Sequence, residues 1–439
     1  MRKLELHWQI LIAIVLAAIA GGLVFEAHAA SGVDPTILGV RYVAIFDYIG
    51  TIFLNALKMI IVPLILSSII VGVAGIGTGG NLGRLGGRTL LFYAVTTLSA
   101  ILLGLVLVNI VAPGIVDGQP AKDLLALHAS TAGLEKAVEG TGLSDVANIF
   151  LRMVPPNIFA AAVEGQMLGV IFFAILFGYF MTHLDDEYAG PLYRFWNAVY
   201  HVMMRMTEWI MKFAPIGVFG LVAGVIAKAG YKAAGPLAVF ALVVLSALVI
   251  HAFVTLPLFL RLVGRVKPYR TMRGLAQAML TAFSTASSSA TLPVTMECVE
   301  QNVGVSNKVS SFVLPLGATV NMNGTALYEC AAAIFIAQAY GLELTFAMQF
   351  AIVSIALLTS VGVAGVPSAS LVAIAIILKA VGLPYEALGV LLVFDRLLDM
   401  ARTSVNIWGD AACATIVARL DGEETNFPLT PGPRRGPSP

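Results

Sequence analysis

A polar stripe runs through the apolar stretch 391–419 and constrains the fold more than any other feature. The stretch is long enough to cross a bilayer, since about 20 helical residues span the hydrocarbon core. Its polar members are Asp395, Asp399, Arg402, Thr403, Asn406 and Asp410. Five of them follow one another at steps of 4, 3, 4 and 4, so on a helix of about 100° per residue they share one face. Charges inside a membrane face a protein interior or a water-filled path. The stripe therefore predicts a binding site, against the alternative of a structural pair between Asp399 and Arg402.

The composition indicates a polytopic membrane protein. Of the 439 residues, 59% are hydrophobic and 12% are charged, whereas soluble domains carry about 25% charged residues. A net charge of +1 argues against a nucleic-acid partner. No lysine follows a glycine, so a phosphate loop is absent and ATP is not expected as the energy source. The three cysteines are expected to be free thiols: Cys298, Cys330 and Cys413.

Six conventional spans are predicted in the half 1–270: about 8–26, 46–76, 88–112, 146–184, 197–229 and 234–262. Several exceed the length that a bilayer requires, so tilts, or kinks at Pro155, Pro156 and Pro215, are expected. Residues 1–30 resemble a signal peptide, but their long apolar run favours a retained first helix. Basic residues in alternate loops favour cytoplasmic N- and C-termini. The tail 421–439 is expected to be disordered.

The second half contains two segments that are too broken to be plain spans. The segment 281–295 carries a run of serines and threonines before Pro293, and 360–370 carries glycines and serines around Pro367. We therefore predict a repeated unit in 271–420: hairpin 271–300, helix 308–340, hairpin 345–385 and helix 387–419. Paired interruptions of this kind mark transporter binding sites built by inverted repeats. The alternative is that the small residues serve only helix packing.

The span between the hairpins supplies cation ligands and a lone acid. The segment 321–325 places two amides, a glycine and a hydroxyl at mid-span, where the glycine would let the helix unwind and expose carbonyl oxygens. Hard cations such as Na⁺ prefer oxygen ligands of this kind. Glu329 lies in an apolar run that favours its neutral form, which suits a proton carrier. The alternative for Glu329 is a neutral carboxyl held by hydrogen bonds for packing.

At these residues the sequence resembles the glutamate transporter family, the dicarboxylate/amino acid:cation symporters. The matching motifs follow in order along nearly the whole chain, at 58–63, 287–289, 321–325, 365–367 and 399–410. The resemblance implies an all-α protein of the inner membrane, with eight transmembrane helices plus two re-entrant helical hairpins. It also implies a homotrimer with an elevator mechanism, in which the third and sixth spans move with 271–420 against a scaffold formed by the rest of 1–270.

The resemblance further implies a substrate, L-glutamate or L-aspartate, and gives roles to the matching positions. Arg402 would grip the side-chain carboxylate, which a planar guanidinium suits, and Asp399 would take the α-ammonium. Ser288 and the hairpin backbone would hold the α-carboxylate. The complete implied set is Ala286, Ser287, Ser288, Thr325, Val366, Ser370, Asp399, Arg402, Thr403 and Asn406.

Sodium and proton sites are implied in the same way. One sodium site would use Gly317, Asn321, Asn406 and Asp410. A second, closed by the lid hairpin, would use Thr319 and Ser360. A third would draw on Tyr93, Thr96, Thr97, Asn321 and Asn323. Glu329 matches family members that co-transport a proton, so proton coupling is expected beside sodium.

The sequence departs from the family at several positions. Asn323 stands where an aspartate is usual, and a missing charge at close range in a low-dielectric site is worth several kcal/mol. The third sodium site is therefore expected to be empty, weak or replaced by proton coupling. Ala286 replaces an arginine of many prokaryotic members, and Val363 replaces a threonine of the lid.

Other functions are disfavoured but stay open. A neutral amino acid would leave Arg402 unpaired, and a C4-dicarboxylate would bring two carboxylates to Asp399 without an ammonium. A predominantly anion-conducting channel is the alternative from another class, and saturable uptake against a gradient would distinguish it. An intramembrane hydrolase is not expected, because no His or Lys lies in 281–295 or 360–370 to act as a base.

Overall fold

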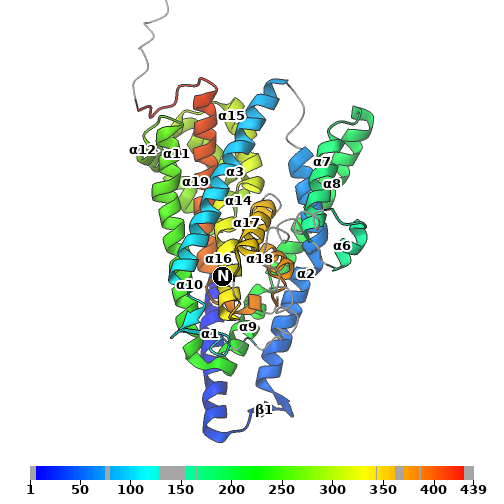
Figure 1. Ribbon diagram of the computed structural model, residues 1–439, viewed down its shortest axis with the longest axis vertical. Coiled ribbons are helices and arrows are strands. Elements are labelled where there is room, and N and C mark those ends of the chain that lie inside the picture. Colours follow the sequence, from blue (N-terminus) through cyan, green and yellow to red (C-terminus); the bar gives the residue numbers. More distant parts are fainter. Residues whose placement is uncertain are drawn as a thin grey trace, which may run out of the picture.

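The computed structural model describes residues 6–74, 80–125, 127, 154–164, 167–342, 344–360, 370–384 and 387–429. These residues are mostly helical, and the long helices lie side by side along the long axis of the molecule (Figure 1). The strands among them form two short antiparallel hairpins. They are β1 (Thr36–Ile37) with β2 (Val40–Arg41), and β3 (Ile115–Val116) with β4 (Gln119–Pro120).

The first half of the chain contains the longest apolar helices. Its elements are α1 (Leu6–Ser31), α2 (Tyr42–Ala74), α3 (Gly80–Val111), α6 (Ile158–Glu164), α7 (Met167–Met181), α8 (Asp186–Met211), α9 (Ala214–Ala229), the 3₁₀ turn η1 (Gly230–Ala233), α10 (Ala234–Ile250), the π-helical turn η2 (His251–Thr255) and α11 (Leu256–Leu262). By length and composition, three helical stretches in the described chain can cross a membrane: Trp8–Ser31, Leu85–Val111 and Gly230–Leu262. They correspond to the predicted first, third and sixth spans.

The predicted span 197–229 is wrong as one helix. The structure ends α8 at Met211 and begins α9 at Ala214, and α8 itself begins at Asp186. Pro215 lies in the first turn of α9, where its missing N–H removes no helical hydrogen bond. The proline therefore starts a new helix instead of kinking a continuous one. In the predicted span 146–184, the described helices are α6 and α7, and 146–153 lie outside the described residues.

Buried apolar side chains form two clusters. The smaller cluster joins mainly α1, α2 and α9, with Ile10 and Phe53 among its members, and it also includes Leu371 and Leu392 of the second half. The larger cluster joins α3 and α10 to the second half of the chain, with Ile101 and Leu248 among its members, and it also includes parts of α2 and α7. The third and sixth predicted spans thus pack against 271–420; that they move with it stays a prediction.

The second half, for which a hairpin, a helix, a second hairpin and a second helix were predicted, contains the helices α12 to α19, and residues 361–369 of the second predicted hairpin lie outside the described residues. Its elements are α12 (Pro268–Gly274), α13 (Ala276–Thr285), α14 (Ser288–Glu297), the π-helical turn η3 (Cys298–Val303), α15 (Asn307–Val320), α16 (Asn323–Ala339), α17 (Phe346–Ser360), α18 (Ser370–Ala380) and α19 (Leu388–Leu420). The first hairpin turns at Ala286, which adopts a left-handed backbone with φ 49° and ψ 37°. Ser287 then caps α14 by accepting a hydrogen bond from the backbone N–H of Ala290.

The predicted helix 308–340 is interrupted at Asn321 and Met322, which separate α15 from α16. The unwinding thus occurs before Gly324, which lies in the first turn of α16. Gly324 serves a different purpose: a Cβ there would lie 2.7 Å from the backbone oxygen of Arg402. The glycine therefore permits α16 to approach α19 closely, and the backbone break falls on the two polar residues before it.

The predicted disordered tail 421–439 is ordered over its first nine residues, 421–429. The backbone N–H of Asn426 donates to Val303 O, and the N–H of Lys267 donates to Phe427 O, both at 2.8 Å. Asp421 forms ion pairs of 3.6 Å with Arg88 and with Lys308. Polar partners in neighbouring elements, rather than apolar burial, hold this segment, so its polar composition misled the prediction.

Candidate functional site

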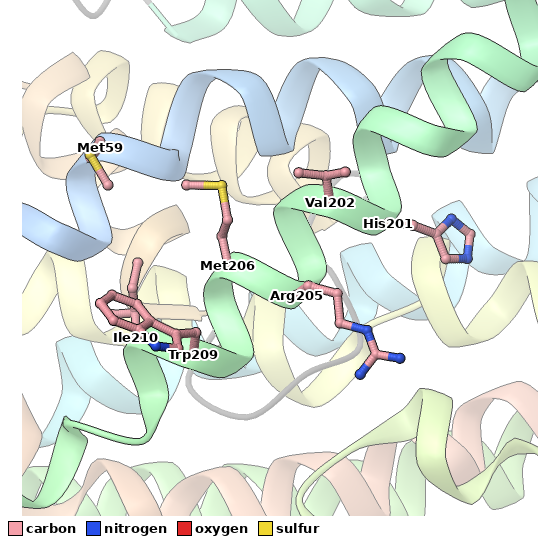
Figure 2. A pocket seen from close by; sticks show the side chains of 7 residues that line it. All are labelled: Met59, His201, Val202, Arg205, Met206, Trp209 and Ile210. Atoms are coloured by element: carbon pink, nitrogen blue, oxygen red, sulfur yellow. The ribbon is translucent and has the colours of Figure 1, made fainter.

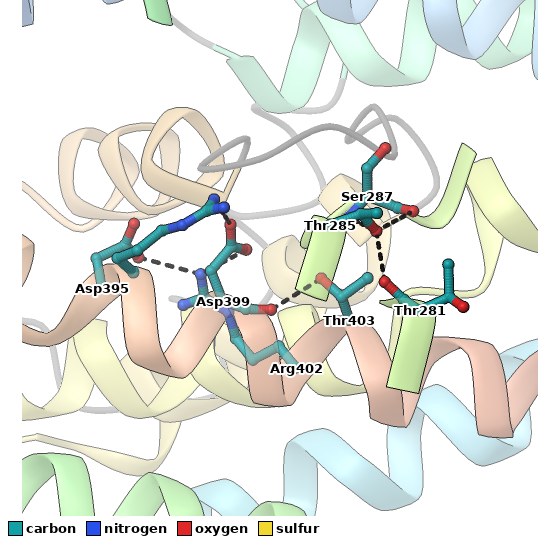
Figure 3. Close-up of polar contacts among 8 residues, drawn as sticks. Thr281, Thr285, Ser287, Asp395, Asp399, Arg402 and Thr403 are labelled. Atoms are coloured by element: carbon teal, nitrogen blue, oxygen red, sulfur yellow. Dashed lines mark hydrogen bonds and ion pairs between the residues drawn. The ribbon is translucent and has the colours of Figure 1, made fainter. Parts of the chain in front are cut away.

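Arg402 lies at the centre of the polar stripe on α19 and is fully buried. Its Nη2 donates to Asp399 Oδ1 at 2.9 Å and to Asp395 Oδ1 at 3.1 Å (Figure 3). The guanidinium carbon also lies 3.8 Å from the centroid of the Tyr328 ring. The steps of 3 and 7 residues along α19 bring the two carboxylates to the same face as the guanidinium. The helical stripe predicted from the sequence is thus a real cluster of charges.

The guanidinium of Arg402 has unused hydrogen-bonding capacity. Its Nε and Nη1 are buried and have no hydrogen-bond partner among the described residues. A buried charged donor without a partner is costly, and native proteins satisfy such groups with a partner, water or a ligand. A carboxylate is the ligand that a guanidinium binds best. The site therefore has the chemistry of a receptor for an anionic group.

The tip of the first hairpin lies beside α19 (Figure 3). Ser288 is buried, and Ser404 Oγ on α19 donates to the backbone oxygen of Met279 in α13 at 2.8 Å. Thr403, expected to orient the substrate, donates to the backbone oxygen of Asp399 one turn earlier, at 2.8 Å. Ser404, which was not predicted as a site residue, connects this arm of the hairpin to α19.

Asn406 joins α19 to the start of α16. Its Oδ1 accepts from the backbone N–H groups of Gly324 at 2.8 Å and Thr325 at 3.4 Å. Its Nδ2 donates to Thr325 Oγ1 at 3.0 Å. The side chain thus satisfies orphan N–H groups at a helix start, where the helix dipole is positive. The broken span directs this positive end toward α19.

A cluster of oxygen atoms surrounds the break between α15 and α16, one helical turn beyond Asn406 on α19. Asn321 Nδ2 donates to Asp410 Oδ1 at 2.8 Å, and Thr96 and Thr97 approach Asn321 Oδ1 at 3.4 and 3.3 Å. A Cβ at Gly317 would lie 2.6 Å from Asp410 Oδ1, so only a glycine fits there without a shift. Carboxylate, amide and hydroxyl oxygens suit a hard cation such as Na⁺.

Asn323, the departure from the family pattern, lies in the same cluster. Its Oδ1 accepts from Thr97 Oγ1 at 2.7 Å, and its Nδ2 lies 3.5 Å from His251 Nε2. His251 is buried in the π-helical turn η2, a feature that often marks functional positions. His251 was not predicted as a site residue, because its contact with Asn323 joins residues far apart in the chain. Tyr93, also assigned here, donates to the backbone oxygen of Val313.

The residues expected at the lid site are only partly brought together. Thr319 donates to Leu316 O at 3.0 Å and Ser360 donates to Leu357 O at 2.7 Å, so each bonds within its own helix. Ser370 is buried at the first residue of α18, and its hydroxyl has no hydrogen-bond partner in the part of the chain that the structure describes. Val363 and Val366 lie outside the described residues.

Glu329 is fully buried in α16. Its Oε2 accepts a hydrogen bond of 3.0 Å from Thr359 Oγ1 in α17, while its Oε1 has no partner among the described residues. Thr359 was not anticipated. Its neighbour Ser360 was noticed for a cation role, but nothing in the local sequence shows that Thr359 faces α16.

A second buried arginine was also missed. Arg396 follows Asp395 directly on α19, is 4% exposed, and places Nη1 at 3.7 Å from Asp399 Oδ2. The sequence signal for Arg396 is its position as a basic residue within the polar stretch. The regular spacing that predicts the stripe does not include position 396.

A separate cavity of about 410 Å³ lies between α2 and α8 (Figure 2). It is lined by Met59 and by a face of α8 that includes Met206, Trp209 and Ile210. His201 and Arg205 also line the cavity, but the atoms that face it are almost all apolar, and none of the predicted site residues lies there. Its chemistry does not fit a small ionic ligand, so the charge cluster on α19 remains the candidate site.

Comparisons with known proteins agree with the geometry. A family model described as the sodium:dicarboxylate symporter family matches residues 6–420. The chain is 35% identical over 427 residues to the proton/sodium-glutamate symport protein of Geobacillus stearothermophilus, covering 96% of each chain. It is 35% identical over 422 residues to the proton/glutamate-aspartate symporter of Escherichia coli K12, covering 95% of this chain and 93% of the relative. It is also 36% identical over 441 residues to the neutral amino acid transporter B(0) of Homo sapiens, covering 94% and 80%.

Proposed function

Because the chain belongs to the sodium:dicarboxylate symporter family, we propose that it imports an acidic amino acid, L-glutamate or L-aspartate, by secondary active symport. Sodium and proton gradients drive the uptake. The family and the relatives named above are transporters rather than enzymes, and no catalytic residue is assigned. Two of these relatives are named for glutamate, and one is named for neutral amino acids, so the substrate is argued from the site.

Buried Arg402 carries the substrate assignment. A neutral amino acid offers no second carboxylate, so it would leave Nε and Nη1 of this guanidinium without an anionic partner in the interior. An acidic side chain supplies the missing acceptor in a planar, two-pronged geometry. Asp399 then binds the α-ammonium of the substrate. This contact replaces part of the present hydrogen bonding between Asp399 and Arg402.

The α-carboxylate is assigned to Ser288 and the turn of the first hairpin, with Ala286 and Ser287 contributing backbone groups. Thr325, Thr403 and Asn406 orient the ligand from α16 and α19. Val366 and Ser370 belong to the second hairpin, which acts as the lid. The hydroxyl of Ser370 is buried and has no hydrogen-bond partner among the described residues, which supports a polar role at this point of the lid.

Co-transported cations are assigned to the oxygen cluster. Gly317, Asn321, Asn406 and Asp410 serve one sodium site, and the short approach of Gly317 to Asp410 supports it. Thr319 and Ser360 serve a second. Tyr93, Thr96, Thr97, Asn321 and Asn323 form a weakened third site. Glu329 carries the proton, and its isolated position in an apolar helix supports this role.

The topology and assembly are proposed by analogy with the family. We propose eight transmembrane helices plus two re-entrant hairpins, a homotrimer in the lipid bilayer of the inner membrane, and cytoplasmic termini. Elevator movement would carry 271–420 with α3 and α10 against the remaining helices. The shared membership of α3, α10 and the second half in the larger apolar cluster supports their moving together, and the members from α2 and α7, such as Ile70 and Ile171, would mark where this cluster meets the remaining helices.

The test is uptake of radiolabelled L-aspartate and L-glutamate into proteoliposomes, with sodium and pH gradients imposed separately. Concentrative, saturable uptake that unlabelled L-alanine and L-serine do not inhibit is the expected result. If unlabelled L-alanine or L-serine inhibited the uptake as strongly as the same concentration of unlabelled acidic amino acid, the protein would be a neutral amino acid transporter instead. Substrate-gated current without accumulation against a gradient would identify an anion channel instead.

A further inference from the structure

Asp399 lies between two guanidinium groups. Arg402 Nη2 is 2.9 Å from its Oδ1, and Arg396 Nη1 is 3.7 Å from its Oδ2. Both arginines are buried, at 0% and 4% exposed. The carboxylate to which the ammonium of the substrate is assigned thus already has a positive charge near each oxygen.

The charges of the cluster cancel without any ligand. Asp395 and Asp399 supply two negative charges, and Arg396 and Arg402 supply two positive ones. A substrate ammonium at Asp399 therefore adds to positive charge that is already there, rather than filling an uncompensated negative site. In a low-dielectric interior such competition between like charges is strong.

The two arginines hold Asp399 in different ways. The Arg402 contact is a hydrogen bond, whereas 3.7 Å is too long for one, so Arg396 acts at Asp399 Oδ2 through charge. Nε and Nη1 of Arg396 have no hydrogen-bond partner in the described part of the chain. Because Arg396 acts on Asp399 Oδ2 through charge at a distance beyond hydrogen bonding, a substrate ammonium can approach this carboxylate while the positive charge of Arg396 stays beside it.

We propose that Arg396 is a specificity-determining residue: by neutralising Asp399 Oδ2 it lowers the advantage of ligands that carry an ammonium over ligands that lack one. This inference rests on the proposed function, since it takes Asp399 as the ammonium site. Arg396 acts through Asp399 and need not contact the substrate.

L-Aspartate and succinate form the matched ligand pair, because both have two carboxylates on a four-carbon chain and only aspartate has the ammonium. Loss of the charge at 396 removes one positive charge from beside Asp399 Oδ2, which favours the ammonium of aspartate and disfavours ammonium-free succinate. The preference for aspartate over succinate should rise by about tenfold or more in Arg396→Met, the effect of one close charge pair. Arg396→Lys keeps the charge and should stay near wild type.

The experiment uses the purified full-length protein in sodium-containing buffer. Binding of radiolabelled L-aspartate is measured directly, and succinate is measured as a competitor, so that each variant yields a ratio of dissociation constants. Arg270→Met, at an exposed position on α12, is the control for loss of an arginine elsewhere. If Arg396→Met does not fold, the same measurement is made with Arg396→Gln, which also lacks the charge.

A raised ratio in Arg396→Met, with unchanged ratios in Arg396→Lys and Arg270→Met, supports the inference. An unchanged ratio in Arg396→Met overturns it while aspartate binding upholds the proposed function. Failure of succinate to compete in the wild type also overturns it, since the ammonium would then be indispensable despite Arg396. Binding of neither ligand to the wild type overturns both the proposed function and the inference.

Discussion

Thr359 Oγ1 donates a 3.0 Å hydrogen bond to Glu329 Oε2 and so connects the second hairpin to α16. Both residues are buried, and the other carboxylate oxygen of Glu329 has no partner among the described residues. A change in the protonation of this carboxyl would therefore alter its hydrogen bond with Thr359 in α17, the helix that precedes the proposed lid residue Ser370. In the proposed function, this contact would connect proton binding at Glu329 to the proposed lid.

Replacing Glu329 with glutamine should abolish the response of uptake to a pH gradient. The amide keeps the shape and can still accept from Thr359, but it cannot bind or release the proton. Uptake driven by a sodium gradient alone should persist. Proteoliposomes with each gradient imposed separately give the measurement, and pH-driven accumulation by the glutamine variant would remove Glu329 from the coupling mechanism.

Replacing Thr359 with valine should weaken the same proton response while sodium-driven uptake remains. Valine conserves the shape and removes only the hydroxyl that reaches Glu329. Thr415→Val on α19 is the matched control, because Thr415 is equally buried and its hydroxyl bonds only to Ala411 O among the described atoms. Equal effects of the two valine substitutions would assign the loss to helix packing rather than to Glu329.

Replacing Arg402 with lysine should reduce L-aspartate uptake by roughly tenfold to a hundredfold, since a hydrogen bond to a charged group is worth about 1.5–3 kcal/mol. Lysine keeps the positive charge beside Asp395 and Asp399 but loses the planar donor pair that matches a carboxylate. Initial rates over a range of substrate concentrations measure the change. The exposed substitution Arg270→Lys should have no effect, and undiminished uptake by Arg402→Lys would contradict a bidentate role.

Replacing Asn323 with aspartate should lower the sodium concentration that half-saturates uptake and steepen the sodium dependence. The change adds a negative charge to the oxygen cluster beside Thr97, where Asn323 Oδ1 already accepts a 2.7 Å hydrogen bond. Uptake rates at constant ionic strength, with choline replacing sodium, give the curve. Asn109→Asp, at an exposed position on α3, controls for the added charge, and an unchanged curve for Asn323→Asp would show that the third site does not bind sodium.

Much of the site could be predicted because it is local to one helix. The regular spacing on α19 placed Asp395, Asp399 and Arg402 on one face, and the structure brings them within hydrogen-bonding distance. The position of Arg396 could not be predicted from the spacing, because its residue number lies outside the stripe and only its long, flexible side chain brings the charge near Asp399.

Contacts between distant segments could not be predicted in the same way. The bonds from Thr359 to Glu329 and from Asn323 toward His251 depend on how separate helices pack, and no periodicity in the sequence encodes that register. A break in this helix was predicted, but it was assigned to Gly324 instead of Asn321 and Met322. The sequence does not show that Gly324 packs against α19.

Replacing Gly324 with alanine should destabilise the protein by about 1–3 kcal/mol, the usual cost of overpacking a tight core. A Cβ at this position would lie 2.7 Å from the backbone oxygen of Arg402, and neither backbone can yield without shifting a helix. Thermal denaturation of the detergent-purified protein measures the loss. Gly235→Ala on α10 is the control, because a Cβ there has no described atom within 4 Å, and equal melting of both variants would contradict the close approach.

Replacing Glu423 with alanine should lower thermal stability by about 1–2 kcal/mol, the size of a lost hydrogen bond to a charged group together with a weakened helix cap. Glu423 accepts from the backbone N–H of Ser306 at 3.0 Å and from the Ser306 hydroxyl, and Ser306 caps α15. The neighbouring substitution Glu424→Ala removes the same charge from an exposed position and should leave the melting temperature unchanged. If both variants melt alike, the ordered segment 421–429 contributes nothing to α15, and its contacts with the first hairpin and α15 are incidental to stability.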